Sequence, residues 1–242
     1  MTLGLLLVLL LICLSFPSWR RRWQLWRWRR QLDADKQFTH WQELFVDVDG
    51  FRLSKACRTH SDAFDYVYGE ITFFSFIALL SLVKPTADTV FYDLGSGVGK
   101  AVFACAMVFK VKKSCGIELF TGLHDAALAV KTNMQVQDLV TAKNIHFINN
   151  DFMQADFSDA DLIFINATGF IGETWQRLNQ RLAETCSATI ITTSKKLSAQ
   201  YFTVTHSTLA EMSWGIVKAF VQQSKSSYSP AIKASKLGTL IK

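Results

Sequence analysis

Residues 89–110 predict a strand, a glycine-rich turn and a helix in immediate succession, an arrangement that few folds accept. Thr89–Tyr92 is β-branched and aromatic, Asp93-Leu94-Gly95-Ser96-Gly97-Val98-Gly99 follows it, and residues 100–110 read as an apolar helix. Glycines at such a turn tolerate positive φ and let the backbone approach a ligand, and the N-terminus of the next helix favours polar or anionic groups. The pattern predicts a ligand-binding turn of an open α/β sheet.

The flanking sequence predicts more elements of the same kind. A helix is expected over residues 73–83, and it ends at Lys84-Pro85 because proline cannot continue a helix. Strands are expected at residues 114–117, 145–148, 162–165 and 188–193. Two β-rich runs, 201–209 and 214–221, are joined by a short polar turn and predict a hairpin. We therefore expect a mostly parallel seven-stranded sheet with a C-terminal antiparallel hairpin.

Polar residues end several of these strands. Glu118 follows the second strand, where its carboxylate can accept both hydroxyls of an adenosine ribose. Asp151 and Phe152 follow the third strand and offer adenine a polar contact and an aromatic face. Asn166 ends the fourth strand, at the edge where open parallel sheets bind ligands. The strand ends predict one crevice for a nucleotide-type ligand.

Two cofactor classes compete for this crevice. A dehydrogenase that binds NAD also has a glycine-rich turn and an acidic end to its second strand. Asp93, however, ends the first strand at the turn, where a carboxylate suits the cationic amino group of methionine better than a pyrophosphate. The predicted terminal hairpin is also what a methyltransferase sheet adds at its edge. We therefore expect S-adenosylmethionine to be the cofactor.

Residues 62–223 resemble the Dot1-type lysine methyltransferases, whose catalytic domain has a Rossmann-like class I methyltransferase fold. The likeness follows the chain in order through short motifs. They are Val67-Tyr68-Gly69-Glu70, Asp93 to Gly99, Glu118, Asp151-Phe152, Asn166, Thr193-Ser194-Lys195 and Ser213-Trp214. The resemblance implies transfer of a methyl group from S-adenosylmethionine to a protein lysine.

The resemblance also implies roles for individual residues. The cofactor-binding positions are Val67, Glu70, Asp93, Gly95, Gly97, Gly99, Lys100, Glu118, Asp151, Phe152 and Asn166, and no metal is implied. The positions expected around the acceptor are Tyr68, Asn166, Trp214 and Phe220. Four positions depart from the family pattern: Ile71 replaces a threonine, Lys100 a glutamine, Ala167 an asparagine, and Phe220 lies near a usual tyrosine. These departures bear on the acceptor more than on the cofactor.

Methyl transfer to lysine requires an uncharged amine. With an unperturbed pKa of about 10.4, roughly 1 lysine in 2,500 is neutral at pH 7, so the site must remove the proton or lower the pKa by burial. We expect Tyr68, Trp214 and Phe220 to line a narrow channel and Asn166 to align the amine with the methyl group. Core packing is the alternative role for Trp214 and Phe220.

The N-terminal end predicts a membrane anchor. Thr2–Trp19 contains no charged side chain and is long enough to span a bilayer, and Arg20-Arg21-Arg22 follows it directly. A cleavable signal peptide normally has its positive charges before the apolar run. The positive-inside rule places everything after residue 20 in the cytoplasm, with the Trp and Arg side chains of residues 19–30 at the headgroups. We expect a single-pass membrane protein.

Four segments are therefore expected. They are an anchor (1–19), a basic juxtamembrane segment and linker (20–61), a methyltransferase domain (62–224) and a tail (225–242). The net charge of +6 is local, because six arginines lie within residues 20–30 and the remaining charges balance. A nucleic-acid-binding surface over the whole domain is therefore not indicated. The five cysteines form no C-x-x-C pair, so a zinc site is not indicated either.

Three functions remain open at this point. The leading one is a protein-lysine methyltransferase that acts on a membrane or membrane-proximal substrate. A methyltransferase for a small molecule or lipid would have a wide acceptor pocket instead of a closed channel. A membrane scaffold that binds the cofactor without catalysis is the third, and the set of Asp93, Glu118 and Asn166 argues against it.

Overall fold

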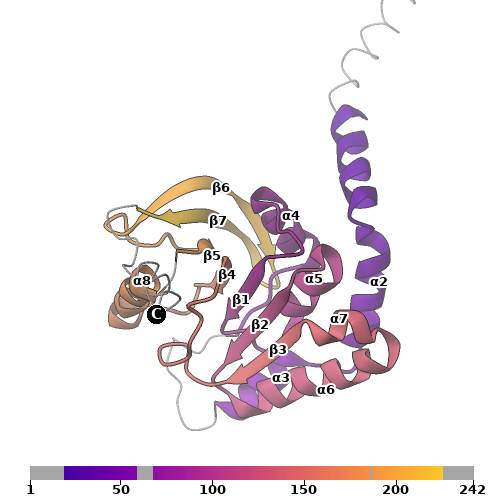
Figure 1. Ribbon diagram of the computed structural model, residues 1–242, viewed down its shortest axis with the longest axis horizontal. Helices are drawn as coiled ribbons and strands as arrows, with labels where there is room; N and C mark the ends of the chain where they lie inside the picture. The colour runs from indigo at the N-terminus through magenta and orange to yellow at the C-terminus, as the bar shows by residue number, and fades with distance from the viewer. Residues whose placement is uncertain (1–18, 59–67, 186, 226–242) are drawn as a thin grey trace, which may run out of the picture.

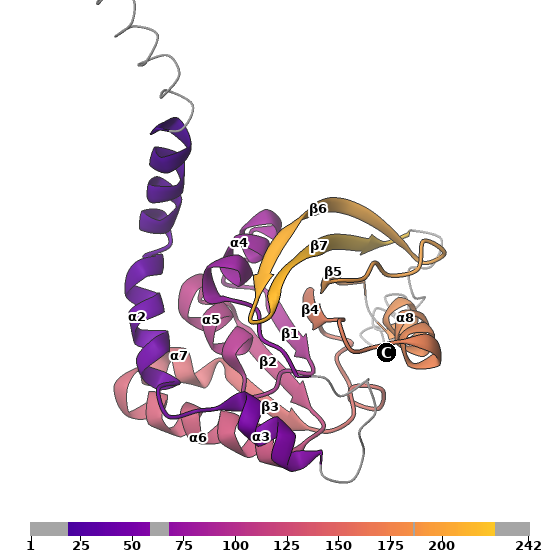
Figure 2. The same ribbon diagram turned by 180° about the vertical axis from the view of Figure 1, so that it is seen from behind.

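A computed structural model describes residues 19–58, 68–185 and 187–225 of the chain, and they form a single sheet covered by helices on both faces (Figures 1 and 2). The seven strands lie in the order β3-β2-β1-β4-β5-β7-β6. Their bounds are β1 Val90–Leu94, β2 Lys113–Glu118, β3 Ile145–Asn149, β4 Leu162–Asn166, β5 Thr189–Thr193, β6 Phe202–Met212 and β7 Gly215–Ser224. Strands β1 to β5 are parallel, and β7 is antiparallel to both β5 and β6, which confirms the predicted sheet and hairpin.

The strand order reverses at β1, and this reversal positions the site. The chain builds outward from β1 through β2 to β3, and then returns to β4 on the other side of β1. Ligands bind open α/β sheets at such a reversal, beyond the carboxyl ends of the strands. Asp93 on β1, Glu118 on β2 and Asn166 on β4 all lie at this edge.

Helices cover both faces of the sheet. Their bounds are α4 Phe73–Val83, α5 Lys100–Phe109, α6 Thr121–Gln137, α7 Leu139–Lys143 and α8 Gly172–Thr185. On one face α4 packs on the sheet through Phe76, whose ring centroid lies 5.2 Å from that of Phe164. On the other face Leu178 and Leu182 of α8 pack against Ile163. Figures 1 and 2 show α8 apart from α4 and α5, across the strands.

Local sequence explains two helix boundaries next to the site. Helix α4 spans the predicted residues and ends at Lys84, which adopts a left-handed conformation (φ 50°) directly before Pro85. Helix α5 begins after Gly99, whose φ of 86° is a conformation that glycine adopts without strain. The helix therefore starts at the end of the glycine turn and points its N-terminus at the edge where the polar residues gather.

The N-terminal segment packs against the domain. Helix α2 (Ala34–Leu44) contacts α5, and α3 (Gly50–Cys57) contacts α6. The ring centroids of Trp41 and Phe73 are 5.4 Å apart. The sequence predicts a linker over residues 20–61, whereas the described part of this range, residues 20–58, contains a helix at residues 19–31 followed by α2 and α3. The aromatic side chains of α2 account for the difference, because they fill the groove beside α4 and α5.

Residues 19–31 are helical, and the end near residue 19 projects beyond the body of the protein, while Trp28 packs against α4 (Figure 1). In the three described stretches of the chain, no helix has both the length and the apolar character needed to cross a membrane. The predicted anchor lies outside the described residues except for Trp19, and so does the predicted tail except for residue 225.

Candidate active site

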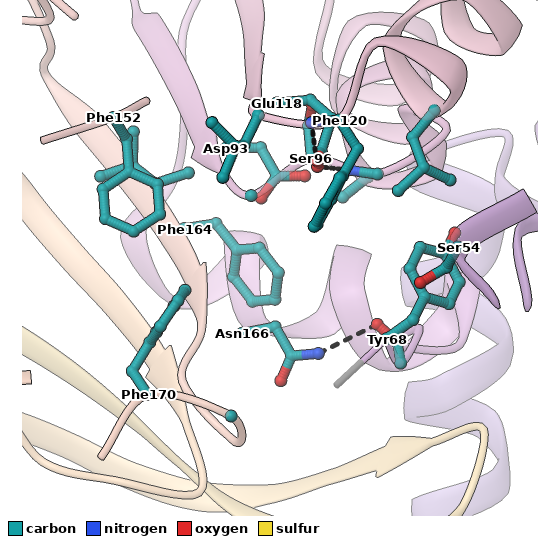
Figure 3. Close-up of a pocket in the computed structure, with 18 of the residues that line it drawn as sticks. Ser54, Tyr68, Asp93, Ser96, Glu118, Phe120, Phe152, Phe164, Asn166 and Phe170 are labelled. Atoms are coloured by element: carbon teal, nitrogen blue, oxygen red, sulfur yellow. Dashed lines mark hydrogen bonds between the residues drawn. The ribbon is translucent and has the colours of Figure 1, made fainter. Parts of the chain in front are cut away.

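A cavity of about 360 Å³ opens at the carboxyl ends of β1, β2 and β4. Figure 3 shows Asp93 and Glu118 on one side of it, Asn166 and Tyr68 on another, and Phe152 and Phe170 at one end. Most of the residues that the sequence singled out line this cavity: Tyr68, Glu70, Asp93, Gly95, Gly97, Lys100, Glu118, Asp151, Phe152 and Asn166. Elements far apart in the chain therefore meet at one place.

The glycine turn brings backbone up to the cavity. Gly95 has a φ of 84°, and a Cβ at this position would meet nothing within 4 Å, so its backbone faces open space. Gly97 has a φ of 55°, and a Cβ there would lie 2.7 Å from the Tyr68 ring. One glycine thus leaves room for a ligand, and the other leaves room for Tyr68 to lie on the turn.

Glu118 is held by two backbone N–H groups, one in the glycine turn and one in the segment that follows β2. Its Oε2 accepts a hydrogen bond from the Gly97 N–H at 2.8 Å, and its Oε1 accepts one from the Phe120 N–H at 2.9 Å. Burial raises the pKa of Glu118, and these two hydrogen bonds act in the opposite direction. Each carboxylate oxygen keeps a second lone pair, so the group can still accept two hydroxyls from a ligand.

Asp93 is the most isolated charge in the cavity. The side chain is 4% exposed, and no described residue donates a hydrogen bond to it or pairs with it as a cation. Burial raises the pKa of Asp93, and with the smaller contribution of the nearby Glu118 carboxylate it reaches about 8. A buried carboxylate without a partner is costly in free energy, so this position favours a ligand that carries a cation.

Asn166 connects three segments around the cavity. Its Nδ2 donates to the Gly69 carbonyl at 3.0 Å, while its Oδ1 accepts from the hydroxyls of Thr193 at 2.8 Å and Thr168 at 3.1 Å. These contacts fix which end of the amide carries the oxygen. They also tie the loop at residues 68–70 to β4 and β5, so Asn166 holds one wall of the cavity in place.

Glu70 and Lys100 were both expected to bind the cofactor, and here they bind each other. The Lys100 Nζ donates to Glu70 Oε2 at 2.7 Å, and the Tyr68 hydroxyl donates to Glu70 Oε1 at 2.8 Å. The sequence could not predict this pairing, because the two residues are separated by α4 and β1.

Three of the predicted positions that the structure describes do not line the cavity, namely Gly99, Trp214 and Phe220, and a fourth, Val67, is outside the described residues. Gly99 lies behind the cavity, against Phe147. Trp214 lies in the turn between β6 and β7, with its ring against Gly69. Phe220 is 4% exposed on β7, where it pairs with Thr192 of β5, and it is not among the residues that line this cavity. The sequence did not establish which face of the sheet Phe220 occupies, because a shift of one residue in the register of a strand exchanges its two faces.

The cavity also contains side chains that the sequence analysis missed. Phe164 lies two residues before Asn166 on β4, a spacing that places both on one face of the strand. Ser54, Phe170 and Arg177 come from α3, a loop and α8, and no local pattern marks them. Among the residues that the structure describes, no cluster of three or more His, Cys, Asp or Glu side chains is arranged to bind a metal.

The sequence matches the protein family described as histone methylation protein DOT1 over residues 53–230. The chain belongs to the Dot1 family. Its folded region is accordingly an S-adenosylmethionine-dependent methyltransferase domain, as the resemblance in the sequence implies. The family match begins within α3, so it includes part of the segment that the sequence analysis treated as a linker.

Two curated relatives of this Dot1-family chain are similar over part of their length. One is the H3 lysine-79-specific histone-lysine N-methyltransferase of Caenorhabditis elegans, 33% identical over 139 residues, which cover 54% of this chain and 15% of that protein. The other is a protein-lysine N-methyltransferase of Saccharolobus islandicus, 29% identical over 85 residues, which cover 35% of this chain and 50% of that protein. The chain thus spans half or less of each relative.

Solved structures share the fold of the Dot1-family domain. A magnesium protoporphyrin IX methyltransferase from Synechocystis PCC 6803 superposes with a TM-score of 0.52 at 11% identity, covering 75% of this chain and 97% of that one. A putative RNA methyltransferase from Pyrococcus horikoshii gives a TM-score of 0.50 at 13% identity, covering 73% and 98%. At such identities the likeness concerns the class I methyltransferase fold alone.

The residues present fit S-adenosylmethionine. The unpaired Asp93 carboxylate suits the ammonium group of the methionine part, and the held Glu118 carboxylate suits the two ribose hydroxyls. At the same turn the Ser96 hydroxyl oxygen is buried, and none of the residues that the structure describes forms a hydrogen bond with it, so a polar ligand can satisfy it. Phe152 and Phe170, with ring centroids 5.4 Å apart, provide an aromatic end for adenine.

Proposed function

We propose that this Dot1-family chain is a protein-lysine N-methyltransferase that acts on a membrane or membrane-proximal protein. The observation that carries the proposal is the family membership, together with relatives from an animal and an archaeon that are both named lysine methyltransferases. Histone H3 is the acceptor named for the animal relative, so it is one candidate substrate. The membrane part of the proposal rests on the sequence and on the exposed surface of residues 19–31.

The residues around the cavity explain how the reaction would proceed. S-adenosylmethionine supplies a methyl group on a sulfonium when it is bound. Asp93 would hold the ammonium group of its methionine part and Glu118 its ribose hydroxyls, and holding these two groups fixes the direction of the methyl group. Asn166 and the Gly69 carbonyl that it binds stand at the β4 side of the cavity, where they can align an amine. The aromatic side chain of Tyr68 helps to desolvate that amine, which favours its neutral form.

A labelled-methyl assay tests the acceptor. Full-length protein is incubated with methyl-labelled S-adenosylmethionine and either histone H3 or solubilised membrane proteins, and the products are hydrolysed and analysed for N-methyl-lysine. Label in methyl-lysine that disappears in an Asp93→Asn variant would support the proposal. Label that is extracted with lipids or small molecules would favour a small-molecule acceptor, and cofactor binding without labelling of any fraction would favour a scaffold.

Trp214→Ala should reduce turnover more than cofactor affinity. The Trp214 ring is 45% exposed, and it lies so close to Gly69 that a Cβ on that glycine would be 1.8 Å from the ring. Removing the ring frees the loop at residues 68–70, and we expect kcat to fall about tenfold with a change below about threefold in the Kd for S-adenosylmethionine. Calorimetry and the labelling assay measure these quantities. Global unfolding of the variant would instead establish a packing role.

The surface of residues 19–31 supports membrane association. Trp19, Trp23 and Trp26 are 62%, 45% and 53% exposed, and the guanidinium groups of Arg27 and Arg30 lie 5.5 and 5.2 Å from the rings of Trp23 and Trp26. On another side of the same helix, the Trp28 Nε1 donates to the Ser81 hydroxyl of α4 at 3.1 Å. One side of this helix therefore packs against the domain. The exposed side combines aromatic rings and positive charge, as interfacial segments do.

Alkaline carbonate extraction of cell membranes tests the predicted anchor. We expect the full-length protein to stay in the membrane pellet at high pH, because an inserted apolar segment is not released when electrostatic contacts are removed. Release into the carbonate wash would instead indicate peripheral membrane binding through the Trp and Arg side chains. Recovery in the soluble fraction at physiological salt would contradict both.

A further inference from the structure

The ammonium group of Lys100 is partly buried at the N-terminus of α5, with 22% of the side chain exposed. Besides its 2.7 Å contact with Glu70, its Nζ lies 5.7 Å from the ring centroids of both Trp41 and Phe45. The Trp41 Nε1 also donates to the Lys100 carbonyl at 2.9 Å. Side chains from α2 and the turn after it therefore surround the lysine, and its charge is directed at Glu70.

Each carboxylate oxygen of Glu70 accepts one hydrogen bond. Lys100 donates to Oε2, and the Tyr68 hydroxyl donates to Oε1. Burial raises the pKa of Tyr68 and the Glu70 carboxylate raises it further, so the phenol keeps its proton and remains a donor. Because Tyr68 and Glu70 flank Gly69, the two hydrogen bonds fix the side chains on either side of the carbonyl that Asn166 binds.

The glycine at the start of α3 completes this arrangement. A Cβ on Gly50 would lie 2.2 Å from the Tyr68 hydroxyl and 2.9 Å from Glu70 Oε1. The phenol ring in turn lies on Gly97 of the glycine turn. The hydroxyl of Tyr68 therefore occupies a site made by Gly50, Gly97 and Glu70. Lys100 neutralises the carboxylate of Glu70 in this site.

We propose that Lys100 is a positioning residue for methyl transfer, which acts by holding Glu70 and thereby the Tyr68 side chain and the loop at residues 68–71 against the cavity. Lys100 replaces a glutamine of the family pattern, so the charge is a property of this chain. The inference rests on the proposed methyl transfer and deepens it: α2 and the turn after it support the active site from behind, because Trp41 and Phe45 pack against the lysine.

Two substitutions of Lys100 test the proposal in the full-length protein. Lys100→Met keeps the length of the side chain and removes the charge, and we expect kcat to fall about tenfold while the Kd for S-adenosylmethionine changes less than about threefold. Lys100→Arg keeps the charge and should recover most of the lost turnover. Lys112→Met, at an exposed lysine outside the cavity, is the matched control and should leave both quantities unchanged.

A double-mutant cycle isolates the pair. Glu70→Gln should lower kcat to a similar extent, and Lys100→Met combined with Glu70→Gln should be no more than about twofold worse than either single variant, because both remove one contact. Independent losses that multiply would contradict the proposal. A Kd for the cofactor weakened tenfold or more by Lys100→Met, with kcat unchanged, would make Lys100 a direct cofactor contact and would also overturn it.

Gly50→Ala tests the position of the Tyr68 hydroxyl from the side of α3. Alanine favours the first turn of a helix, so α3 should not be weakened, but the new methyl group must displace the flexible ends of Tyr68 and Glu70. We expect faster hydrogen exchange at the amides of residues 69–72 in both Gly50→Ala and Lys100→Met, by about tenfold, and an unchanged rate in Lys112→Met. Exchange needs no acceptor, so this readout remains valid if the acceptor proposal fails. Unchanged exchange in both variants would refute the positioning role.

Discussion

Asp93→Asn should weaken S-adenosylmethionine binding about 100-fold and yet stabilise the protein in the absence of cofactor. The side chain is buried, and within residues 19–58, 68–185 and 187–225 nothing pairs with it, so a charge here costs free energy until a cation is bound. Loss of one partner of a buried charge pair removes about 3 kcal/mol of binding, which corresponds to roughly 100-fold in Kd. The neutral amide keeps the shape and removes the unpaired charge. Thermal unfolding should then occur about 2–4 °C higher at pH 8, equivalent to about 1 kcal/mol.

The stability gap between the Asp93→Asn variant and the natural protein should grow with pH. Burial raises the pKa of Asp93 from 3.8 in the unfolded chain to about 8, so the folded state binds the proton more tightly. The natural protein therefore loses stability as the pH rises from about 4 to 8, and the variant does not lose this contribution. Thermal unfolding at pH 5 and pH 8 measures the gap, with the exposed Asp88→Asn as the control. A gap between the two proteins that is the same at pH 5 and pH 8 would show that the Asp93 carboxylate is already paired.

The same pKa predicts that cofactor binding releases protons. Near pH 7 Asp93 is largely protonated, and it must ionise to hold an ammonium group. Affinity should rise from pH 6 toward pH 8, where the α-amino group of the ligand, with a pKa of about 8, begins to lose its own proton. Calorimetry in buffers with different ionisation enthalpies should detect release of most of one proton at pH 7. Absence of release would place the ammonium group elsewhere in the cavity.

Asn166→Asp should lower turnover about 100-fold with less than about a fivefold change in cofactor affinity. The amide donates to the Gly69 carbonyl and accepts from two threonine hydroxyls, so only the donor side is lost in the carboxylate. A carboxylate oxygen would repel the Gly69 carbonyl and displace the loop by a fraction of an ångström, and a misplacement of this order can cost about 100-fold in rate.

Two milder variants separate the contributions of Asn166. Thr193→Val removes one hydroxyl that binds Oδ1 and leaves the contact with Gly69, so we expect a loss of turnover of about tenfold or less. Asn166→Ala removes all contacts without adding charge and should lie between the other two. Initial rates and calorimetric Kd values on the same preparations measure the series. Equal rates for Asn166→Asp and the natural protein would exclude a role for the amide in aligning the acceptor.

The segments of regular structure were predictable because their patterns are local. The helix expected at residues 73–83 is α4 to the residue, and the strand at 162–165 differs from β4 by only Asn166 at its end. In β1, all five residues are buried, as a central strand of a parallel sheet requires, and the glycine turn follows at once. Apolar periodicity, glycine and proline suffice for such elements, since each depends on neighbours within a few residues.

The sequence by itself therefore determined the strands, the turn and the polar residues that end the strands, because parallel strands place their carboxyl ends at one edge. Only the tertiary structure decided which side chains satisfy one another there. Lys100 pairs with Glu70 across thirty residues, Phe220 does not line the cavity, and no described residue pairs with Asp93. Such choices depend on burial and on contacts between distant segments. The packing of Trp41 on α5 likewise joins the N-terminal helix to the site, because that contact exists only once the domain has folded.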